Sequence, residues 1–236
     1  MSGRIPDATV TRLPLYRRSL IELVNQHVVT VSSEQLADTA GVNAAQVRKD
    51  LSFLGTHGTR GVGYDVQNLL AEIEGTLGLH EESAVVIVGM GNLGQALANY
   101  GGFRQRGFPV VALFDADPKK VGTSIGGITI QSVGELAAVV ARQGVAIGII
   151  ATPATSAQAV ADVLSAAGVR SILNFAPVVL NVPLEIPVRK VDLATELQIL
   201  SFYQQHPGPE DIAGERTFAP NGRAGSESGH MPREKP

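Results

Sequence analysis

The segment Ala84-Val85-Val86-Ile87-Val88-Gly89-Met90-Gly91-Asn92-Leu93-Gly94 joins five apolar residues to a Gly-x-Gly-x-x-Gly motif. A continuous apolar run bounded by glycine is typical of a strand buried on both faces of a parallel sheet. In this motif Gly89 allows the tight turn, Gly91 lets the backbone approach a pyrophosphate, and Gly94 lets the next helix pack close to the strand. We therefore predict a dinucleotide-binding loop, followed by a helix over about residues 92–100 whose N-terminal amides face the phosphates.

A second apolar strand, over residues 109–114, ends at Asp115, about 20 residues after the last glycine of the motif. A carboxylate at that spacing hydrogen-bonds a ribose 2′-hydroxyl and disfavours a 2′-phosphate, which favours NADH and NAD+ as ligands. Lys119 and Lys120 follow closely and leave NADP(H) open. Taken alone, the motif is also compatible with an ordinary turn of a parallel sheet that binds no ligand.

The composition indicates a globular protein, because 44% of the 236 residues are hydrophobic and 17% are charged. The chain has no cysteine, so disulfides and thiolate nucleophiles are excluded, and we expect a reducing, cytoplasmic location and no metal site. No apolar run reaches 18 residues and the first 18 residues are polar, so we expect neither a membrane span nor a signal peptide. The net charge of −3 gives no general attraction to nucleic acid.

The N-terminal part reads as a helix-turn-helix. We predict a first helix over about residues 14–27, and a capping box, Ser32-Ser33-Glu34-Gln35, that opens a short second helix. Gly41 ends this helix, and Asn43 is a good N-cap for a third helix over residues 44–54. Two short helices joined by a glycine-containing turn, within a set of three, form the helix-turn-helix arrangement.

The third helix has two unlike faces. Its inward face carries Val47, Leu51 and Leu54. Its outer face is small, basic and hydroxylic and carries Ala45, Arg48, Lys49 and Ser52. Arginine can bind a guanine edge with two hydrogen bonds, and serine and lysine can reach phosphates or bases, so this face suits a major groove. The alternative is a solvated helix face with two cations.

A glycine-rich stretch follows the third helix. Residues 55–64 contain four glycines, and the alternation of Val62 and Tyr64 with glycine predicts a tight hairpin. A hairpin directly after a recognition helix is a wing, and Arg60 near its tip can insert in a minor groove. The alternative is a plain hairpin with an exposed arginine. Basic residues on or near the first helix add positive charge: Arg12, Arg17 and Arg18.

The remainder of the chain alternates strands with helices. Asp65 caps a helix that ends at Gly78, and a polar joint, residues 80–83, separates it from the first strand of a predicted doubly wound parallel sheet. The further strands are expected over residues 128–130, 145–151, 169–175 and 188–191, and the helices over residues 132–143, opened by a second capping box at Ser132, and 157–167. Two segments lie at strand ends where such sheets bind ligands: Thr152-Pro153-Ala154 and Asn174-Phe175.

A last helix is expected over residues 192–205. It is apolar nearly all round, so it must be buried on several sides, and insertion into a partner subunit is one way to bury it. The alternative is a helix packed on its own domain. Residues 207–236 contain five prolines and five glycines and read as a disordered tail. The predicted domains are therefore a winged helix-turn-helix (1–82), a Rossmann NAD(H)-binding domain (83–191), a dimerisation helix (192–206) and a tail (207–236).

The predicted dinucleotide domain is poorly equipped for catalysis. A nicotinamide oxidoreductase usually needs a proton donor, commonly His, Lys or Tyr. Residues 81–205 contain no histidine and only three lysines, and Tyr100 has no lysine four residues later. Carboxylates remain, chiefly Asp192. We therefore predict a sensor rather than an enzyme, with an oxidoreductase that carries a regulatory DNA-binding domain as the alternative.

Several segments resemble the Rex family of bacterial redox-sensing transcriptional repressors. Ser33-Glu34-Gln35-Leu36, Gln46-Val47-Arg48-Lys49-Asp50-Leu51-Ser52 and Gly58-Thr59-Arg60-Gly61-Val62-Gly63-Tyr64 resemble its winged-helix domain. Gly89-Met90-Gly91-Asn92-Leu93-Gly94 and Asn174-Phe175-Ala176-Pro177-Val178 resemble its Rossmann domain. The similarity covers about residues 8–205. Because the Rossmann half also resembles CoA-binding domains, a CoA-responsive regulator is a further alternative.

The resemblance implies a homodimer that represses genes of fermentative or respiratory metabolism. NADH binding is then expected to close the dimer and release double-stranded operator DNA, whereas NAD+ competes and permits binding. It also implies a C-terminal helix exchanged between subunits, and a switch in which Asp192 pairs either with Arg18 or with Tyr100 near the nicotinamide. The expected DNA-binding residues are Ala45, Arg48, Lys49, Ser52, Arg60, Ser33 and Gln35. The expected cofactor-binding residues are Gly89, Met90, Gly91, Asn92, Leu93, Gly94, Asp115, Tyr100, Thr152, Pro153, Ala154, Asn174, Phe175 and Asp192.

Overall fold

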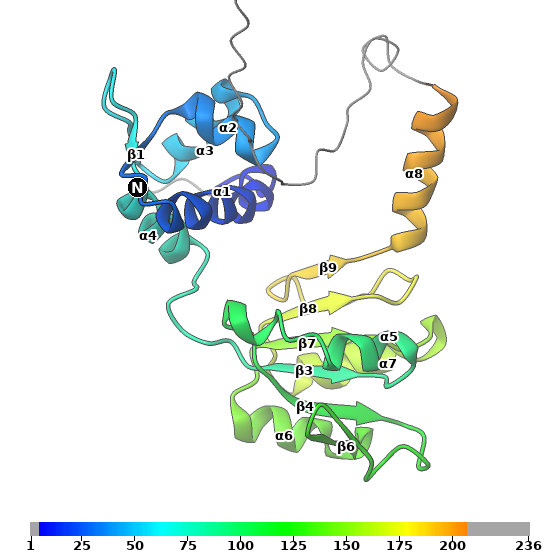
Figure 1. Ribbon diagram of the computed structural model, residues 1–236. Helices are drawn as coiled ribbons and strands as arrows, with labels where there is room; N and C mark the ends of the chain where they lie inside the picture. Colours follow the sequence, from blue (N-terminus) through cyan, green and yellow to red (C-terminus); the bar gives the residue numbers. More distant parts are fainter. Residues whose placement is uncertain (1–4, 207–236) are drawn as a thin grey trace, which may run out of the picture. The chain divides into compact units, whose positions relative to one another are not determined.

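The computed structural model describes residues 5–206, so the predicted tail, residues 207–236, lies outside the described residues (Figure 1). Two sets of buried side chains follow one another along the chain. The first lies between Leu13 and Ile73 and the second between Val85 and Ile186. A separate unit begins at Asp192.

The first core is built by four helices and a two-stranded ribbon. The helices are α1 (Asp7–Asn25), α2 (Ser33–Ala40), α3 (Ala44–Phe53) and α4 (Val66–Thr76), and the ribbon pairs β1 (Thr30–Val31) with β2 (Tyr64–Asp65). The predicted start of the first helix at residue 14 is wrong by seven residues. The first turns of α1 are buried through Thr9 and Leu13, while Pro14 lies on the exposed side of the helix.

Local capping chemistry places the helices of the helix-turn-helix as predicted. The Ser32 hydroxyl accepts the Gln35 N–H at 3.1 Å, and the Gln35 side chain accepts the Ser32 N–H at 2.9 Å, which completes the capping box of α2. Gly41 ends α2 in the left-handed conformation, and the Asn43 side chain accepts the Gln46 N–H at 2.8 Å to open α3. These bonds satisfy backbone groups that a short helix leaves unpaired, so the turn geometry follows from the sequence.

The predicted hairpin is present as a short wing. A bridge between Thr59 and Gly63 closes its tip, which leaves Arg60 exposed at the turn. Beyond the tip the chain pairs with β1, a strand that was not predicted, in the register Val31 with Tyr64. Gly63 has a φ of +97°, and a Cβ there would collide with the carbonyl oxygen of Val31, so glycine is required for the ribbon to close.

The second core surrounds a seven-stranded sheet in the order β5-β6-β4-β3-β7-β8-β9 (Figure 1). Its strands are β3 (Val85–Val88), β4 (Val110–Asp115), β5 (Ser124–Ile125), β6 (Ile128–Ser132), β7 (Ile147–Ile150), β8 (Ser171–Asn174) and β9 (Val188–Lys190). All pairs are parallel except β5 with β6. The six parallel strands have the order 3-2-1-4-5-6 in chain order, so the predicted doubly wound sheet is confirmed.

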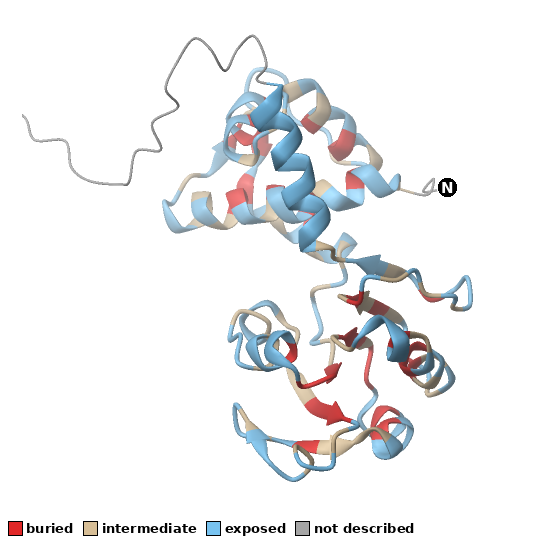
Figure 2. Ribbon diagram, turned by 90° about the vertical axis from the view of Figure 1, so that its right-hand side faces the viewer, coloured by how far each residue is buried: buried red, intermediate tan, exposed pale blue. Residues whose placement is uncertain are grey.

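Helices cover both faces of this sheet. Side chains of α6 (Leu136–Gln143) and α7 (Ala154–Ala166) pack on one face, and α5 (Asn92–Ala98) with the segment around η1 (Arg104–Arg106) packs on the other. Every residue of β3 is buried, as its unbroken apolar sequence predicts, and buried strands form the interior in Figure 2.

Three predicted helix boundaries in this domain differ from the structure. The second capping box is wrong: the Ser132 hydroxyl accepts the Gly134 N–H at 3.3 Å, and this short reach makes the 3-10 turn η2 (Val133–Glu135) before α6 begins. The helix α7 begins at Ala154, three residues earlier than predicted, because Pro153, with φ −56° and ψ 153°, is its N-cap. The helix α5 ends at Ala98, two residues before Tyr100.

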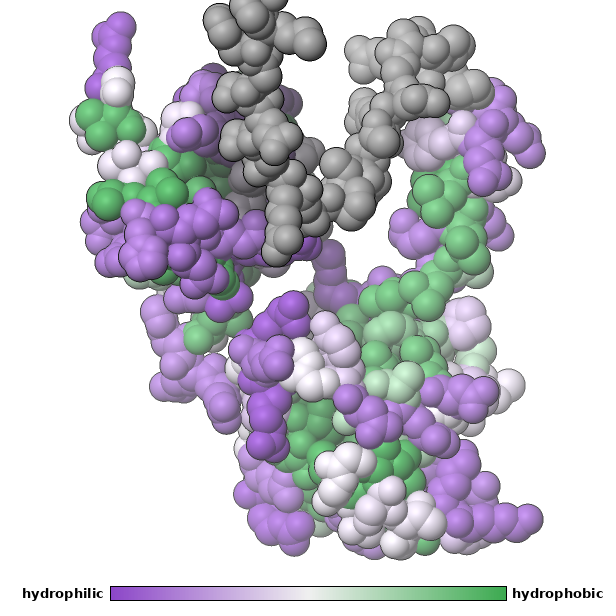
Figure 3. All heavy atoms as spheres, in the orientation of Figure 1, coloured by the Kyte–Doolittle hydropathy of each residue, from purple (hydrophilic) through white to green (hydrophobic). Residues whose placement is uncertain are grey.

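The last helix, α8 (Leu193–Gln205), has no buried residue (Figure 2). Asp192 is its N-cap and accepts the Thr195 N–H at 3.3 Å. Its large apolar side chains are 45–66% exposed and form much of its surface in Figure 3: Leu193, Leu197, Ile199, Leu200, Phe202 and Tyr203. Within residues 5–206, no helix has both the length and the apolar character needed to cross a membrane.

Candidate functional site

The three glycines of the loop between β3 and α5 differ in the space around their Cα atoms. Gly89 has a φ of +99°, and a Cβ there would lie 2.7 Å from the carbonyl oxygen of Ala151. A Cβ on Gly94 would collide with the carbonyl oxygen of Gly89. A Cβ on Gly91 would have no neighbour within 4 Å. The first and third glycines are therefore required for folding, whereas the second faces free space into which a ligand can approach the backbone.

Asp115, at the end of β4, is tied to this loop. Its carboxylate accepts the Met90 N–H at 2.7 Å and the Asp117 N–H at 2.8 Å, and it pairs with the Lys120 ammonium at 3.0 Å. Burial raises the pKa of Asp115, but the Asp117 N–H, the Lys120 side chain and the Met90 N–H outweigh this and lower it. A carboxylate has about four acceptor positions, so an acceptor position is left for a hydroxyl ligand.

A pocket of about 570 Å³ lies at the carboxyl ends of β3, β4 and β7. Its lining includes Gly89, Gly91, Asp115, Lys120, Thr152 and Pro153. It therefore lies at the point where the strand order reverses, which is where open sheets of this kind bind ligands. Among the buried side-chain polar atoms of the described chain, only the Thr152 hydroxyl has no hydrogen-bond partner. A ligand with polar groups would satisfy it, so the pocket fits a dinucleotide.

Other predicted cofactor residues have different surroundings. The buried Asn174 side chain donates to the Val178 carbonyl at 2.9 Å and accepts the Ala176 N–H at 2.9 Å, so it braces the loop after β8. Tyr100 is half exposed, packs edge-to-face on Phe103, and accepts a bond from Arg106 at 3.3 Å. Tyr100 lines a separate hollow beside the first residues of β4 and β6, and not the pocket of the glycine loop.

The outer face of α3 is exposed as predicted. Ala45, Arg48, Lys49 and Ser52 are all exposed. Arg48 donates to the Ser33 hydroxyl at 2.8 Å and pairs with Glu34 at 3.1 Å, both at the start of α2. The Ser52 hydroxyl donates to the Lys49 carbonyl at 2.6 Å within its own helix. The guanidinium of Arg48 is thus held against α2, with a carboxylate beside it.

A hollow of about 360 Å³ joins the predicted DNA-binding elements. The start of α2, the Arg48 side chain and the wing from Gly58 to Tyr64 line it, so Ser33, Arg48 and Arg60 share one concave surface. Gln35 does not line it, and its side-chain oxygen is engaged in the capping box. A concave surface with two arginines between the predicted recognition helix and the wing suits a DNA backbone.

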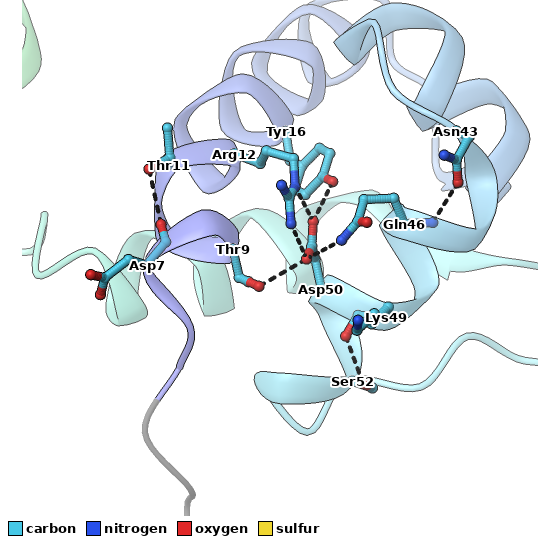
Figure 4. A network of polar contacts seen from close by, with 10 residues as sticks. All are labelled: Asp7, Thr9, Thr11, Arg12, Tyr16, Asn43, Gln46, Lys49, Asp50 and Ser52. Carbon is cyan, nitrogen blue, oxygen red and sulfur yellow. Dashed lines mark hydrogen bonds and ion pairs between the residues drawn. The ribbon is translucent and has the colours of Figure 1, made fainter.

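The most densely bonded side chain in this domain, Asp50, was missed by the sequence reasoning. It is fully buried on α3 and accepts hydrogen bonds from Arg12, Tyr16 and other residues (Figure 4). Arg12, predicted only as added positive charge, is its ion-pair partner at 2.6 Å. A signal was available, because Asp50 lies three residues after the inward-facing Val47, and a carboxylate on a buried face must be paired.

The two remaining arginines of α1 pair elsewhere. Arg17 forms an ion pair with Glu74 of α4 at 2.8 Å, and Arg18 approaches Glu22 on its own helix at 3.6 Å. The Arg18 side chain is 82% exposed, so its ion pair with Glu22 is weak and easily exchanged for another partner. In the described residues, no group of three or more His, Cys, Asp or Glu side chains is arranged to hold a metal ion.

Comparison with known proteins identifies the family. The sequence is 57% identical over 223 residues to the redox-sensing transcriptional repressor Rex of Streptomyces griseus. The matched region covers 94% of this chain and 88% of that relative. The chain belongs to the Rex family. The Rex repressor of Streptomyces coelicolor is 58% identical over 93% of this chain and 85% of that protein.

Solved structures and family models agree with this membership. The Rex-family repressor RSP, crystallised with β-NAD+ and operator DNA, is 37% identical with a TM-score of 0.81, covering 86% of this chain and 93% of that one. Residues 4–52 match a model described as a putative DNA-binding protein N-terminus, and residues 80–178 match a CoA binding domain. The resemblance read from short motifs is therefore confirmed.

Proposed function

We propose that this Rex-family chain is a homodimeric transcriptional repressor that binds operator DNA and releases it when its Rossmann-like domain is filled by NADH. The observation that carries the proposal is that one chain combines an exposed basic helix face beside a wing with a glycine-loop pocket that contains an unpartnered hydroxyl. The related repressor RSP has been crystallised with β-NAD+ and operator DNA, and with β-NADH, which supports both ligands.

In the cofactor pocket we assign the pyrophosphate to the backbone from Gly89 to Gly94, because Gly91 leaves that backbone open. We assign the adenosine ribose to Asp115 and a polar group of the ligand to the Thr152 hydroxyl. Because Lys120 forms an ion pair with Asp115, the electrostatic repulsion between that carboxylate and a bound pyrophosphate is reduced. The segments 152–154 and 174–175 complete the proposed lining.

For DNA binding we assign the major groove to the outer face of α3 and the minor groove to the wing. Arg48 and Lys49 supply charge and base contacts, and Arg60 is placed at the wing tip. The remaining proposed contacts are Ala45, Ser52, Ser33 and Gln35. Because Arg48 is paired with Glu34, it must exchange that partner for DNA.

The proposed switch consists of Arg18, Tyr100 and Asp192 and requires the dimer. Tyr100 and the glycine loop line different hollows of the same chain, so the proposed contact between Tyr100 and the nicotinamide is not formed within the glycine-loop pocket alone. The bare apolar surface of α8 supports the same arrangement, because an exchanged helix would bury it against the partner.

We propose further that residues 1–82 and 83–191 act as the DNA-binding and NAD(H)-binding domains, and that residues 192–206 dimerise. As a DNA-bound regulator, the protein would act in the bacterial cytoplasm and not as an enzyme. The absence of histidine from residues 81–205 supports a sensor, because the usual proton donor for hydride transfer is missing.

A CoA-responsive regulator is the second candidate, because residues 80–178 match the CoA binding domain model. Titration calorimetry of the purified protein with NADH, NAD+ and CoA separates the two. We expect NADH to bind most tightly and CoA to bind weakly, and tighter binding of CoA would reverse the assignment. Steady oxidation of NADH by small carbonyl substrates at enzyme-like rates would instead support an oxidoreductase.

A further inference from the structure

Asp50 stands on the recognition helix between the exposed Lys49 and the buried Leu51, and its side chain is fully buried. Its two carboxylate oxygens accept five hydrogen bonds. Gln46, one turn earlier on the same helix, donates one of them at 2.8 Å. All the others come from α1, so this single carboxylate links the recognition helix to another element of the domain.

The donors on α1 lie on one face of that helix, spaced three and four residues apart (Figure 4). Thr9 donates at 2.9 Å and Tyr16 at 2.7 Å. Arg12 donates twice, from Nε at 2.6 Å and from Nη2 at 2.8 Å. This bidentate geometry fixes the orientation of the carboxylate relative to the guanidinium as well as their distance. The contact therefore specifies how α3 is rotated against α1.

The charges within this cluster are balanced. Burial alone would raise the pKa of Asp50, but hydrogen bonds from Arg12, Tyr16 and Thr9 lower it to about 2. The carboxylate is therefore ionised at neutral pH, and the guanidinium of Arg12 is committed to it. A buried ion pair adds little net stability compared with apolar packing, but it can specify one arrangement of the elements that carry it.

We propose that Asp50 is a positioning residue for DNA recognition, which holds α3 at the rotation that presents Arg48 to base edges and Lys49 to a phosphate, and that Arg12 acts through Asp50 rather than by contacting DNA. This inference rests on the proposed function, in which α3 enters the major groove. Apolar contacts of Val47 and Leu51 hold α3 on the core, but such contacts are non-directional and leave small rotations open.

The salt dependence of binding distinguishes positioning from direct contact. Each phosphate contact removed lowers the slope of log K against log salt by about 0.9, whereas a misplaced helix lowers affinity for the operator with the slope retained. Three variants perturb the cluster. Tyr16→Phe deletes one hydrogen-bond donor and keeps the ring, and Arg12→Lys keeps the charge but loses the bidentate geometry. Asp50→Asn removes the charge of the acceptor. Lys49→Ala is the matched control for a direct contact.

We expect Asp50→Asn and Arg12→Lys to weaken operator binding by about tenfold or more, the equivalent of one charge-assisted hydrogen bond. Their salt slopes and their affinity for unrelated DNA should match those of the wild type. Tyr16→Phe should show the same pattern with a smaller loss. Circular dichroism checks that each variant is folded, and if Asp50→Asn unfolds, the comparison rests on the two milder variants.

Folded variants that bind the operator as tightly as the wild type would overturn this inference. A lowered salt slope for Arg12→Gln, which removes the charge, would also overturn it, because Arg12 would then touch a phosphate. Two other results would contradict the proposed function itself: wild-type protein that does not bind operator, or a Lys49→Ala variant with an unchanged salt slope.

Discussion

We expect that replacing Gly91 with alanine will weaken cofactor binding without impairing folding. Gly91 is the N-cap of α5, with a φ of −74° that alanine adopts readily, and a Cβ there has no neighbour within 4 Å. The added methyl group therefore meets no protein atom. It projects instead into the space through which a pyrophosphate would approach the backbone amides of the loop.

The size of the effect follows from these contacts. Alanine is a poorer N-cap than glycine, which costs up to about 1 kcal/mol, and it is stiffer in the unfolded chain, which returns about 0.4–1 kcal/mol. The free energy of unfolding should therefore change by less than about 1 kcal/mol. A displaced phosphate loses one or two charge-assisted hydrogen bonds of about 1.5–3 kcal/mol each, so NADH affinity should fall at least about tenfold.

Calorimetric titration with NADH and a chemical unfolding curve measure the two quantities on the same preparation. Gly94→Ala is the matched control, because a Cβ there collides with the Gly89 carbonyl and should damage both binding and stability. Operator binding by Gly91→Ala should persist at NADH concentrations that release the wild type. Unchanged NADH affinity in folded Gly91→Ala would refute the assignment of the pyrophosphate to this loop.

Three further outcomes are expected. Glu34→Gln removes a carboxylate that pairs with Arg48 at 3.1 Å and repels DNA, so operator affinity measured by anisotropy should rise about three- to tenfold. A loss of operator affinity would instead assign Glu34 to a base contact. The pKa of Asp50 is about 2 in the folded state against 3.8 in the unfolded state, so its contribution to stability is present above pH 3.8 and is lost as the pH falls towards 2. Acid unfolding of Asp50→Asn should lack this contribution. Identical acid unfolding of the variant and the wild type would contradict the pairing. Leu200→Glu on α8 should yield monomers in sedimentation velocity while Gln204→Glu stays dimeric, and a dimeric Leu200→Glu would exclude this face of α8 from the interface.

Local chemistry made most of the fold predictable. The apolar run of β3 with its glycine loop, and the caps at Ser32 and Asn43, act over a few residues and are visible in the sequence. The start of α1 was missed because its first turns depend on Thr9, which bonds to Asp50, 41 residues away. Such a contact leaves no local pattern to read.

The candidate site was predictable in part for the same reason. The glycine motif places the pocket, and the spacing of α3 places its exposed basic face. Spacing could not show that Tyr100 is separated from the glycine loop by the length of α5, or that Arg48 is paired with Glu34. Asp50 was overlooked because only apolar residues were counted on the buried face of α3.

The proposed competition between reduced cofactor and DNA can be tested directly by fluorescence anisotropy of labelled operator at one fixed salt concentration. The salt must be fixed because affinity for DNA changes by orders of magnitude with ionic strength. We expect the wild-type protein to bind operator alone or with NAD+, and saturating NADH to weaken that binding at least about tenfold, a coupling of about 1.4 kcal/mol or more. Operator binding of unchanged strength in protein saturated with NADH would contradict it.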